Sequence, residues 1–217
     1  MKNRYLTLIS MVLAAAVTAS ASVAAKVDGF RSAKFGAKEK AVVVAAIKDL
    51  HVNRKAIRRT RDPVSQVTIL SVKVNNFGPL KVPATVSYVM GYKCDCLTQA
   101  TVQWNLSDKL SQNARGGAMI GVSALVGQFQ NKNWGKNEMF TNRVAGKVDK
   151  AGNGTIVFFR GQNKAGGAIT LLGGPVKLVK GSKDQMTANI DKLKSVTLLY
   201  ERNAAHPDVN KIDVSGF

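Results

Sequence analysis

A stretch of alternating apolar and polar side chains, Ala84–Trp104, constrains the fold of this chain more than any other feature. Successive side chains of a β-strand point to opposite faces, so each half of the stretch places its apolar residues on one face. These apolar residues are Val86, Tyr88, Met90, Ala100, Val102 and Trp104. Gly91–Asp95 interrupts the alternation and predicts a tight reversal. The stretch therefore predicts a hairpin with one face on a core and the other in water.

A second stretch, Thr155–Gly174, partly repeats the first. The pairs that align without a gap are Thr85 with Thr155, Val86 with Ile156, Tyr88 with Phe158 and Gly91 with Gly161. This partial repeat predicts an internal duplication in which each half is a helix followed by a hairpin. We expect the halves at 26–106 and 107–217, the second ending in a closing strand and a tail.

Helices are predicted ahead of both hairpins. Ala37–Leu50 has apolar residues at the i, i+3, i+4 and i+7 spacing of a buried stripe, and a helix is also expected within Leu110–Phe129. The expected buried residues are Val43, Ala46, Ile47 and Leu50 in the first helix and Met119, Val122, Val126 and Phe129 in the second. Glycines weaken the second prediction, since each costs about 1 kcal/mol relative to alanine inside a helix. Ser182–Leu193 predicts a short third helix.

The rest of the chain divides into strands and loops. Val67–Val74 and Val196–Glu201 are expected to be strands. The segments 51–62, 75–83 and 131–154 are rich in polar residues, glycine or proline and are expected to be loops. Together these elements predict an α+β fold, with one or two antiparallel sheets and helices packed on one face.

The first residues have the pattern of a signal peptide. Lys2 and Arg4 precede an apolar run, Leu6–Val17, that is short for a bilayer span. Val23–Ala25 follows as a cleavage site. We expect cleavage after Ala25 and release into the periplasm, with no transmembrane span left in the mature chain. An uncleaved anchor helix is the alternative, and the short apolar run disfavours it.

The charge of the chain is strongly basic. It carries 32 basic and 13 acidic residues, and removal of Lys2 and Arg4 with the signal peptide lowers the formal net charge from +19 to +17. This balance favours an anionic partner, either an acidic protein or an anionic component of the envelope. Nucleic acid is disfavoured because an exported protein seldom meets it. The alternative is a solvated surface that keeps the protein soluble.

One basic cluster stands out within the segment 51–62. Its members are Arg54, Lys55, Arg58, Arg59 and Arg61. Arginine forms bidentate hydrogen bonds with phosphate oxygens, so the cluster is a candidate anion-binding site. It lacks the interleaved aromatic residues that single-stranded nucleic-acid sites use. The alternative interpretation is a solvated loop.

The two cysteines, Cys94 and Cys96, lie in the predicted reversal. A pair two residues apart is compatible with a redox couple, with an intermolecular disulfide, or with a soft-metal site that includes Met90. A closed zinc site needs four ligands, and nothing in the sequence places His51 or His206 near the pair. The alternative is two turn residues without a special role, and we expect no metal or other cofactor.

No catalytic motif is evident. The sequence lacks a G-x-S-x-G elbow, an H-E-x-x-H helix and a phosphate-binding glycine loop, so no catalytic residue is assigned. Tyr92, in the predicted reversal, is the best candidate for an exposed contact residue.

Three segments resemble a group of uncharacterised exported proteins from alphaproteobacteria. FRSAKFGAKEKAVVVAAI is similar to the start of their mature part, VSYVMGYKCDCLTQATVQW to their central hairpin, and LLYERNAAHPDVNKIDVSGF to their closing strand and tail. The chain departs from the group at Cys94 and Cys96, which replace polar residues, so the resemblance implies no shared role for the cysteines. More distantly, a duplicated helix-plus-hairpin looks like the folds of the lipoprotein SmpA/OmlA and of the β-lactamase inhibitory protein, which present a surface to other proteins.

The sequence therefore predicts a periplasmic, non-catalytic protein with a binding or envelope-support role. Its sheet face or its basic cluster would engage an anionic or protein partner. One alternative is a protein that handles redox equivalents or copper through Cys94 and Cys96, with or without Met90. A further alternative is an enzyme whose site no motif in the sequence reveals.

Overall fold

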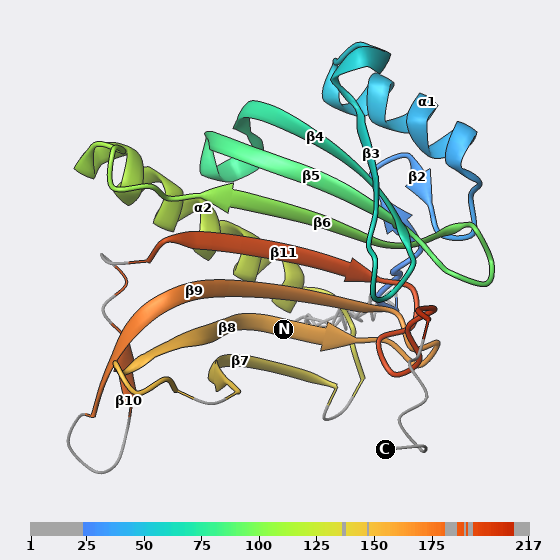
Figure 1. Cartoon of the computed structure of the whole chain (residues 1–217). Helices are drawn as coiled ribbons and strands as arrows, with labels where there is room; N and C mark the ends of the chain where they lie inside the picture. The colour runs from blue at the N-terminus through green and yellow to red at the C-terminus, as the bar shows by residue number, and fades with distance from the viewer. Residues whose placement is uncertain are drawn as a thin grey trace, which may run out of the picture.

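The computed structural model describes residues 24–135, 138–146, 148–180, 186–188, 190 and 193–210 (Figure 1). Two helices lie in this part of the chain, α1 (Glu39–Leu50) and α2 (Gln112–Gln130), with single 3-10 turns at η1 (Arg54–Ala56) and η2 (Gly78–Leu80). The strands are β1 (Gly29–Phe30), β2 (Ala33–Lys34), β3 (Arg58–Arg61), β4 (Thr68–Phe77), β5 (Val82–Met90), β6 (Leu97–Asn105), β7 (Met139–Ala145), β8 (Asn153–Gln162), β9 (Ala168–Lys180), β10 (Met186–Ala188) and β11 (Ser195–Glu201). The predicted α+β class is confirmed.

Eight strands form one antiparallel sheet in the order β3-β4-β5-β6-β11-β9-β8-β7, and β10 pairs with β9. The order is symmetric about the central pair of strands, β6 and β11. Each of these two strands is the last in a series of elements that begins with a helix. The run α1, β3, β4, β5, β6 fills one half of the sheet, and α2, β7, β8, β9, β11 fills the other. Each half thus has four main strands after its helix, instead of a hairpin alone.

The symmetry differs from the alignment that the sequence suggested. The partial repeat aligns Thr85–Met90 with Thr155–Arg160, which lie in β5 and β8. Counted outward from the central pair, β5 corresponds to β9, and β8 corresponds to β4. The duplication itself remains a prediction, but the two segments of the partial repeat lie in strands that do not occupy equivalent positions in the sheet.

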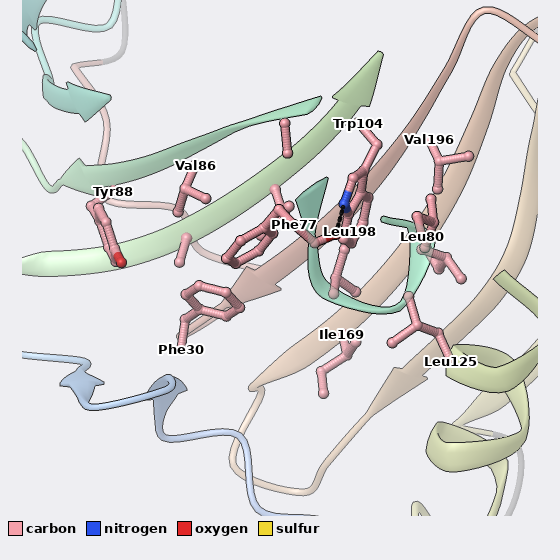
Figure 2. Packing of buried hydrophobic residues seen from close by; sticks show 14 of the residues in the cluster. Phe30, Phe77, Leu80, Val86, Tyr88, Trp104, Leu125, Ile169, Val196 and Leu198 are labelled. Carbon is pink, nitrogen blue, oxygen red and sulfur yellow. Dashed lines mark hydrogen bonds between the residues drawn. The ribbon is translucent and has the colours of Figure 1, made fainter. Parts of the chain in front are cut away.

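The core lies between one face of this sheet and a layer made by α1, α2 and the β1–β2 hairpin (Figure 1). Aromatic rings join the layers: Phe30 of β1 packs on Tyr88 of β5, with ring centroids 6.4 Å apart, and Phe129 of α2 packs on Phe159 of β8 at 5.4 Å. Trp104 is 1% exposed, and its Nε1 donates to the Phe77 carbonyl oxygen at 2.9 Å (Figure 2). The apolar face predicted for the central hairpin is the face that packs in this core.

Both predicted helices form, with differences in their buried faces. α1 begins two residues later than expected and buries Val42 and Ala45 as well as the predicted stripe, in which Ile47 is half-buried. α2 buries Ala118, Gly121, Val122, Leu125 and Phe129. Met119 and Val126 are only half-buried. The helix packs through small residues such as Ala118 and Gly121, so these two expected core residues lie at the edge of its buried face.

Three segment predictions are wrong. The expected loops 51–62 and 131–154 contain β3 and β7, and residues 75–83 are partly taken up by the ends of β4 and β5. The expected third helix, Ser182–Leu193, lies partly outside the described residues, and its described part includes the strand β10. β3 and β7 are the edge strands of the sheet, and their mostly exposed side chains lack the apolar alternation that reveals a half-buried strand.

The predicted signal peptide lies outside the described residues except for Ala24 and Ala25. Ala24 pairs with Asn133 in an isolated bridge, and the Ala25 amide donates to the Asn133 carbonyl oxygen at 2.8 Å. In the described part of the chain, no helix has the length and apolar character that crossing a membrane requires.

Tyr88→Phe is expected to raise the free energy of unfolding by about 1 kcal/mol. The Tyr88 side chain is fully buried, and its hydroxyl has no hydrogen-bond partner among the described residues. Removing a buried, unpaired hydroxyl removes its desolvation cost, whereas the ring contact with Phe30 is kept. Urea denaturation would measure the change, with Tyr92→Phe at the exposed turn as the control. A clear loss of stability would show that the hydroxyl is hydrogen-bonded.

Candidate functional site

The second face of the sheet is left without a covering layer by the described helices, which all pack on the opposite face (Figure 1). We call it the open face and define it by three rows of directly paired residues that cross the strands. The first row is Arg58, Ser71, Ser87, Thr101, Leu199, Thr170, Arg160 and Phe140. The second row is Lys73, Thr85, Gln103, Thr197, Leu172, Val157 and Arg143. The third row is Thr60, Ile69, Val89, Gln99, Glu201, Ala168 and Gln162.

The cations of the open face lie at its two margins. Arg58 and Lys73 stand on β3 and β4 at one side, and Arg143 and Arg160 on β7 and β8 at the other. Between them the first two rows contain only hydroxyl, amide and aliphatic side chains. Directly paired residues share a face of a sheet, so this distribution follows from the register of the strands.

Two contacts order the margin formed by β7 and β8. The Arg143 guanidinium lies over the Phe140 ring, 4.9 Å from its centroid. Arg160 Nη1 donates to Thr170 Oγ1 at 2.8 Å and lies 3.8 Å from a Glu201 carboxylate oxygen. Burial raises the pKa of Glu201, and the neighbouring Arg160 offsets only part of this rise. Glu201 is the single acidic residue of the three rows, so the open face is net positive.

The surface is hollowed at both ends of these strands. A hollow of about 440 Å³ is lined by Lys73, Thr85 and Gln103 together with the neighbouring residues of β4, β5, β6 and β11. A second hollow, of about 260 Å³, forms where the segment 202–209 crosses the strand ends beside Gln99 and Glu201. His206 lines this second hollow, whereas His51 is the C-cap of α1.

The basic cluster predicted from the sequence does not form one patch. Arg54 and Lys55 lie in η1, and the next arginines lie in β3, where successive side chains alternate between the two faces. Arg58 falls on the open face. Arg59 points toward the helix side, where its Nε lies 3.2 Å from a Glu39 carboxylate oxygen, and Arg61 donates to Gln66 Oε1 at 3.4 Å.

Neither edge of the sheet favours the addition of a further strand. β3 is only four residues long and carries three exposed arginines. β7 is interrupted at Asn142, whose φ of 52° departs from extended geometry. Short, charged or irregular edges oppose strand pairing with another chain.

The cysteine pair forms a disulfide in the turn between β5 and β6. The Asp208 carboxylate accepts hydrogen bonds from the Lys93 and Cys94 amides, both at 2.9 Å. The Tyr92 amide donates to the Asp208 carbonyl oxygen at 2.9 Å, and the Tyr92 side chain is 40% exposed.

The residues of the suggested soft-metal site lie in different surroundings. Met90 is fully buried in the core, and both cysteine sulfurs are bonded to each other. Among the described residues, no group of three or more histidine, cysteine, aspartate or glutamate side chains is placed to hold a metal ion.

Comparison with known proteins identified no relative of this chain. A scan against protein-family models, a search of curated proteins and a search of solved structures found no match to this chain.

Sequence reasoning missed three cations of the open face, Lys73, Arg143 and Arg160. The alternation of polar and apolar residues along a strand gives a local signal for such cations, since Lys73 lies between the buried Val72 and the half-buried Val74. That signal places each residue on the water side of its own strand, but it does not say which strands are neighbours.

Proposed function

We propose that this chain is an exported binding protein that holds an acidic protein partner on the open face of its sheet. The observation that carries the proposal is the distribution of charge on that face: cations lie at both margins, and Glu201 is the single charged residue of the rows between them. Protein interfaces have the same anatomy, with charged residues depleted at the centre and polar, solvated residues at the rim.

The size of the open face suits a protein partner. Eight strands spaced about 4.8 Å apart follow a contour of roughly 34 Å across the sheet. Most residues of the three rows are exposed or half-buried, and Thr170, Val157 and Ala168 are buried. A standard interface takes roughly 800 Å² per partner. Insertion into a lipid surface would need protruding apolar side chains. The large exposed apolar residues of the described chain, among them Val44, Ile120 and Met139, lie outside the three rows.

The charge of the face selects for an acidic partner. Four cations against Glu201 leave the three rows net positive, in keeping with the +17 expected for the mature chain. Cations at an interface rim mainly speed association and exclude partners of like charge, so binding should weaken as the salt concentration rises.

Neutralising the exposed cations at the margins of the open face is expected to lower sharply the amount of partner that is recovered with the protein after crosslinking. The test variant combines Arg58→Gln, Lys73→Gln and Arg143→Gln, and leaves Arg160 with Glu201. Tagged mature protein would be crosslinked in the periplasm and purified, with protein and lipid both analysed. Each rim charge contributes to the association rate, so we expect a roughly tenfold or larger loss of the recovered partner at low salt.

The matched control combines Lys40→Gln, Lys48→Gln and Lys109→Gln, exposed lysines that lie outside the three rows. It removes the same charge and should retain the partner. Equal losses in the two variants would mean that only net charge matters, and recovery of lipid without a discrete protein would contradict an acidic protein partner. The N-terminal residue of the purified protein, read by mass spectrometry, would test export and cleavage after Ala25.

A further inference from the structure

The Cys94–Cys96 disulfide closes a turn that hydrogen bonds already hold. The Gly91 amide donates to the Cys96 carbonyl oxygen at 2.8 Å, and the Asp95 amide donates to the Gly91 carbonyl oxygen at 3.0 Å. The Asp208 carboxylate fixes the Lys93 and Cys94 amides from the tail. A bond between residues two apart constrains very little of the unfolded chain, because its stabilising effect grows with the length of the closed loop. The disulfide therefore adds little to the stability of the fold.

The two sulfurs lie in different surroundings. Cys96 is 5% exposed, and Arg202 Nη1 donates to its Sγ at 3.6 Å. Cys94 is more exposed, and Lys38 Nζ donates to its carbonyl oxygen, not to its sulfur. A neighbouring guanidinium stabilises a thiolate, so Cys96 is the better leaving sulfur and Cys94 is the sulfur that a thiolate can reach.

We propose that this disulfide is a thiol–disulfide exchange site that oxidises a pair of thiols on a partner. A partner thiolate attacks Cys94 Sγ, the bond between the two sulfurs breaks, and the electron pair goes to Cys96 Sγ beside Arg202. The second thiolate of the partner then attacks the partner sulfur that is bonded to Cys94 Sγ. The partner leaves as a disulfide, and Cys94 leaves as a thiolate that takes a proton from water.

The turn is built to be used repeatedly. The hydrogen bonds from the Gly91, Lys93, Cys94 and Asp95 amides do not involve sulfur, so they keep the two thiols close together after reduction. Reaction with another disulfide, such as oxidised glutathione, restores the bond by the same steps in reverse. The site adjoins the open face, because Arg202 and Asp208 lie in the segment that crosses the ends of its strands, but its chemistry does not depend on the partner proposed for that face.

Exchange would be followed with the oxidised mature protein and a reduced Cys-x-x-Cys peptide at pH 7. Acid quenching, alkylation and mass spectrometry would count the thiols on both molecules. We expect one peptide disulfide for each pair of protein thiols formed, with Arg202→Gln slower by about 3- to 10-fold because the leaving thiolate loses its cation. Arg202→Lys should restore part of the rate. Lys38→Gln, which removes a cation that contacts the Cys94 carbonyl oxygen of the same turn, should keep the wild-type rate.

The order of the two sulfurs has its own test in single-cysteine variants. Cys96→Ser leaves the accessible Cys94 thiol and should form a mixed disulfide with oxidised glutathione, whereas Cys94→Ser should react at least about tenfold more slowly. Circular dichroism would confirm that both variants fold. A disulfide that resists the peptide, equal rates for Arg202→Gln and Lys38→Gln, or faster reaction of Cys96 than of Cys94 would overturn the proposal.

Discussion

Trp104→Ala is expected to lower the free energy of unfolding by about 3 to 5 kcal/mol, the largest effect of any substitution proposed for this chain. Trp104 is 1% exposed on β6, one of the two central strands, and its ring lies 6.4 Å from the Phe77 ring. The change opens a cavity and also leaves the buried Phe77 carbonyl oxygen without its indole donor. Equilibrium denaturation in urea would measure the loss.

Two further variants separate the parts of this effect. Trp104→Phe keeps much of the apolar volume but removes the donor to Phe77, so it should cost about 1 to 3 kcal/mol. Gln103→Ala, at an exposed position of the same strand, should change stability by less than about 0.5 kcal/mol. If Trp104→Ala were no more harmful than Gln103→Ala, the core would not be centred on the β6–β11 pair.

Gly121→Ala is expected to destabilise the protein by about 1 to 3 kcal/mol, although alanine is the better helix former. α2 packs against η2 at this residue, and a Cβ at position 121 would lie 2.6 Å from the Pro79 carbonyl oxygen and 2.9 Å from the Leu80 Cα. Both are backbone atoms, which cannot move aside as a flexible side chain can. The helix and the turn would have to separate, and thermal or urea denaturation would report the cost.

Gly116→Ala supplies the matched control on the same helix. A Cβ there meets no atom within 4 Å, so only the helix propensity changes and stability should rise by up to about 1 kcal/mol. The two substitutions are chemically identical and should have opposite signs. A gain in both would mean that α2 does not contact η2 closely.

Part of each candidate site was accessible from the sequence. Cys94 and Cys96 were placed in the correct turn, but Asp208 and Arg202, which fix and polarise that turn, lie more than a hundred residues away. The basic cluster was recognised by composition, yet its members separate because β3 turns alternate side chains to opposite faces. No spacing within one segment reveals either relation.

The elements that could be predicted from local sequence are those with one buried and one exposed face. The hairpin of β5 and β6, the helix α1 and the closing strand β11 each show a local period, because one face of each is buried and the other is wet. The order of the strands, and with it the composition of the open face, became known only from the folded structure. Its rows join residues from eight strands, and pairing between strands distant in sequence depends on how their apolar faces pack together, which no local pattern records.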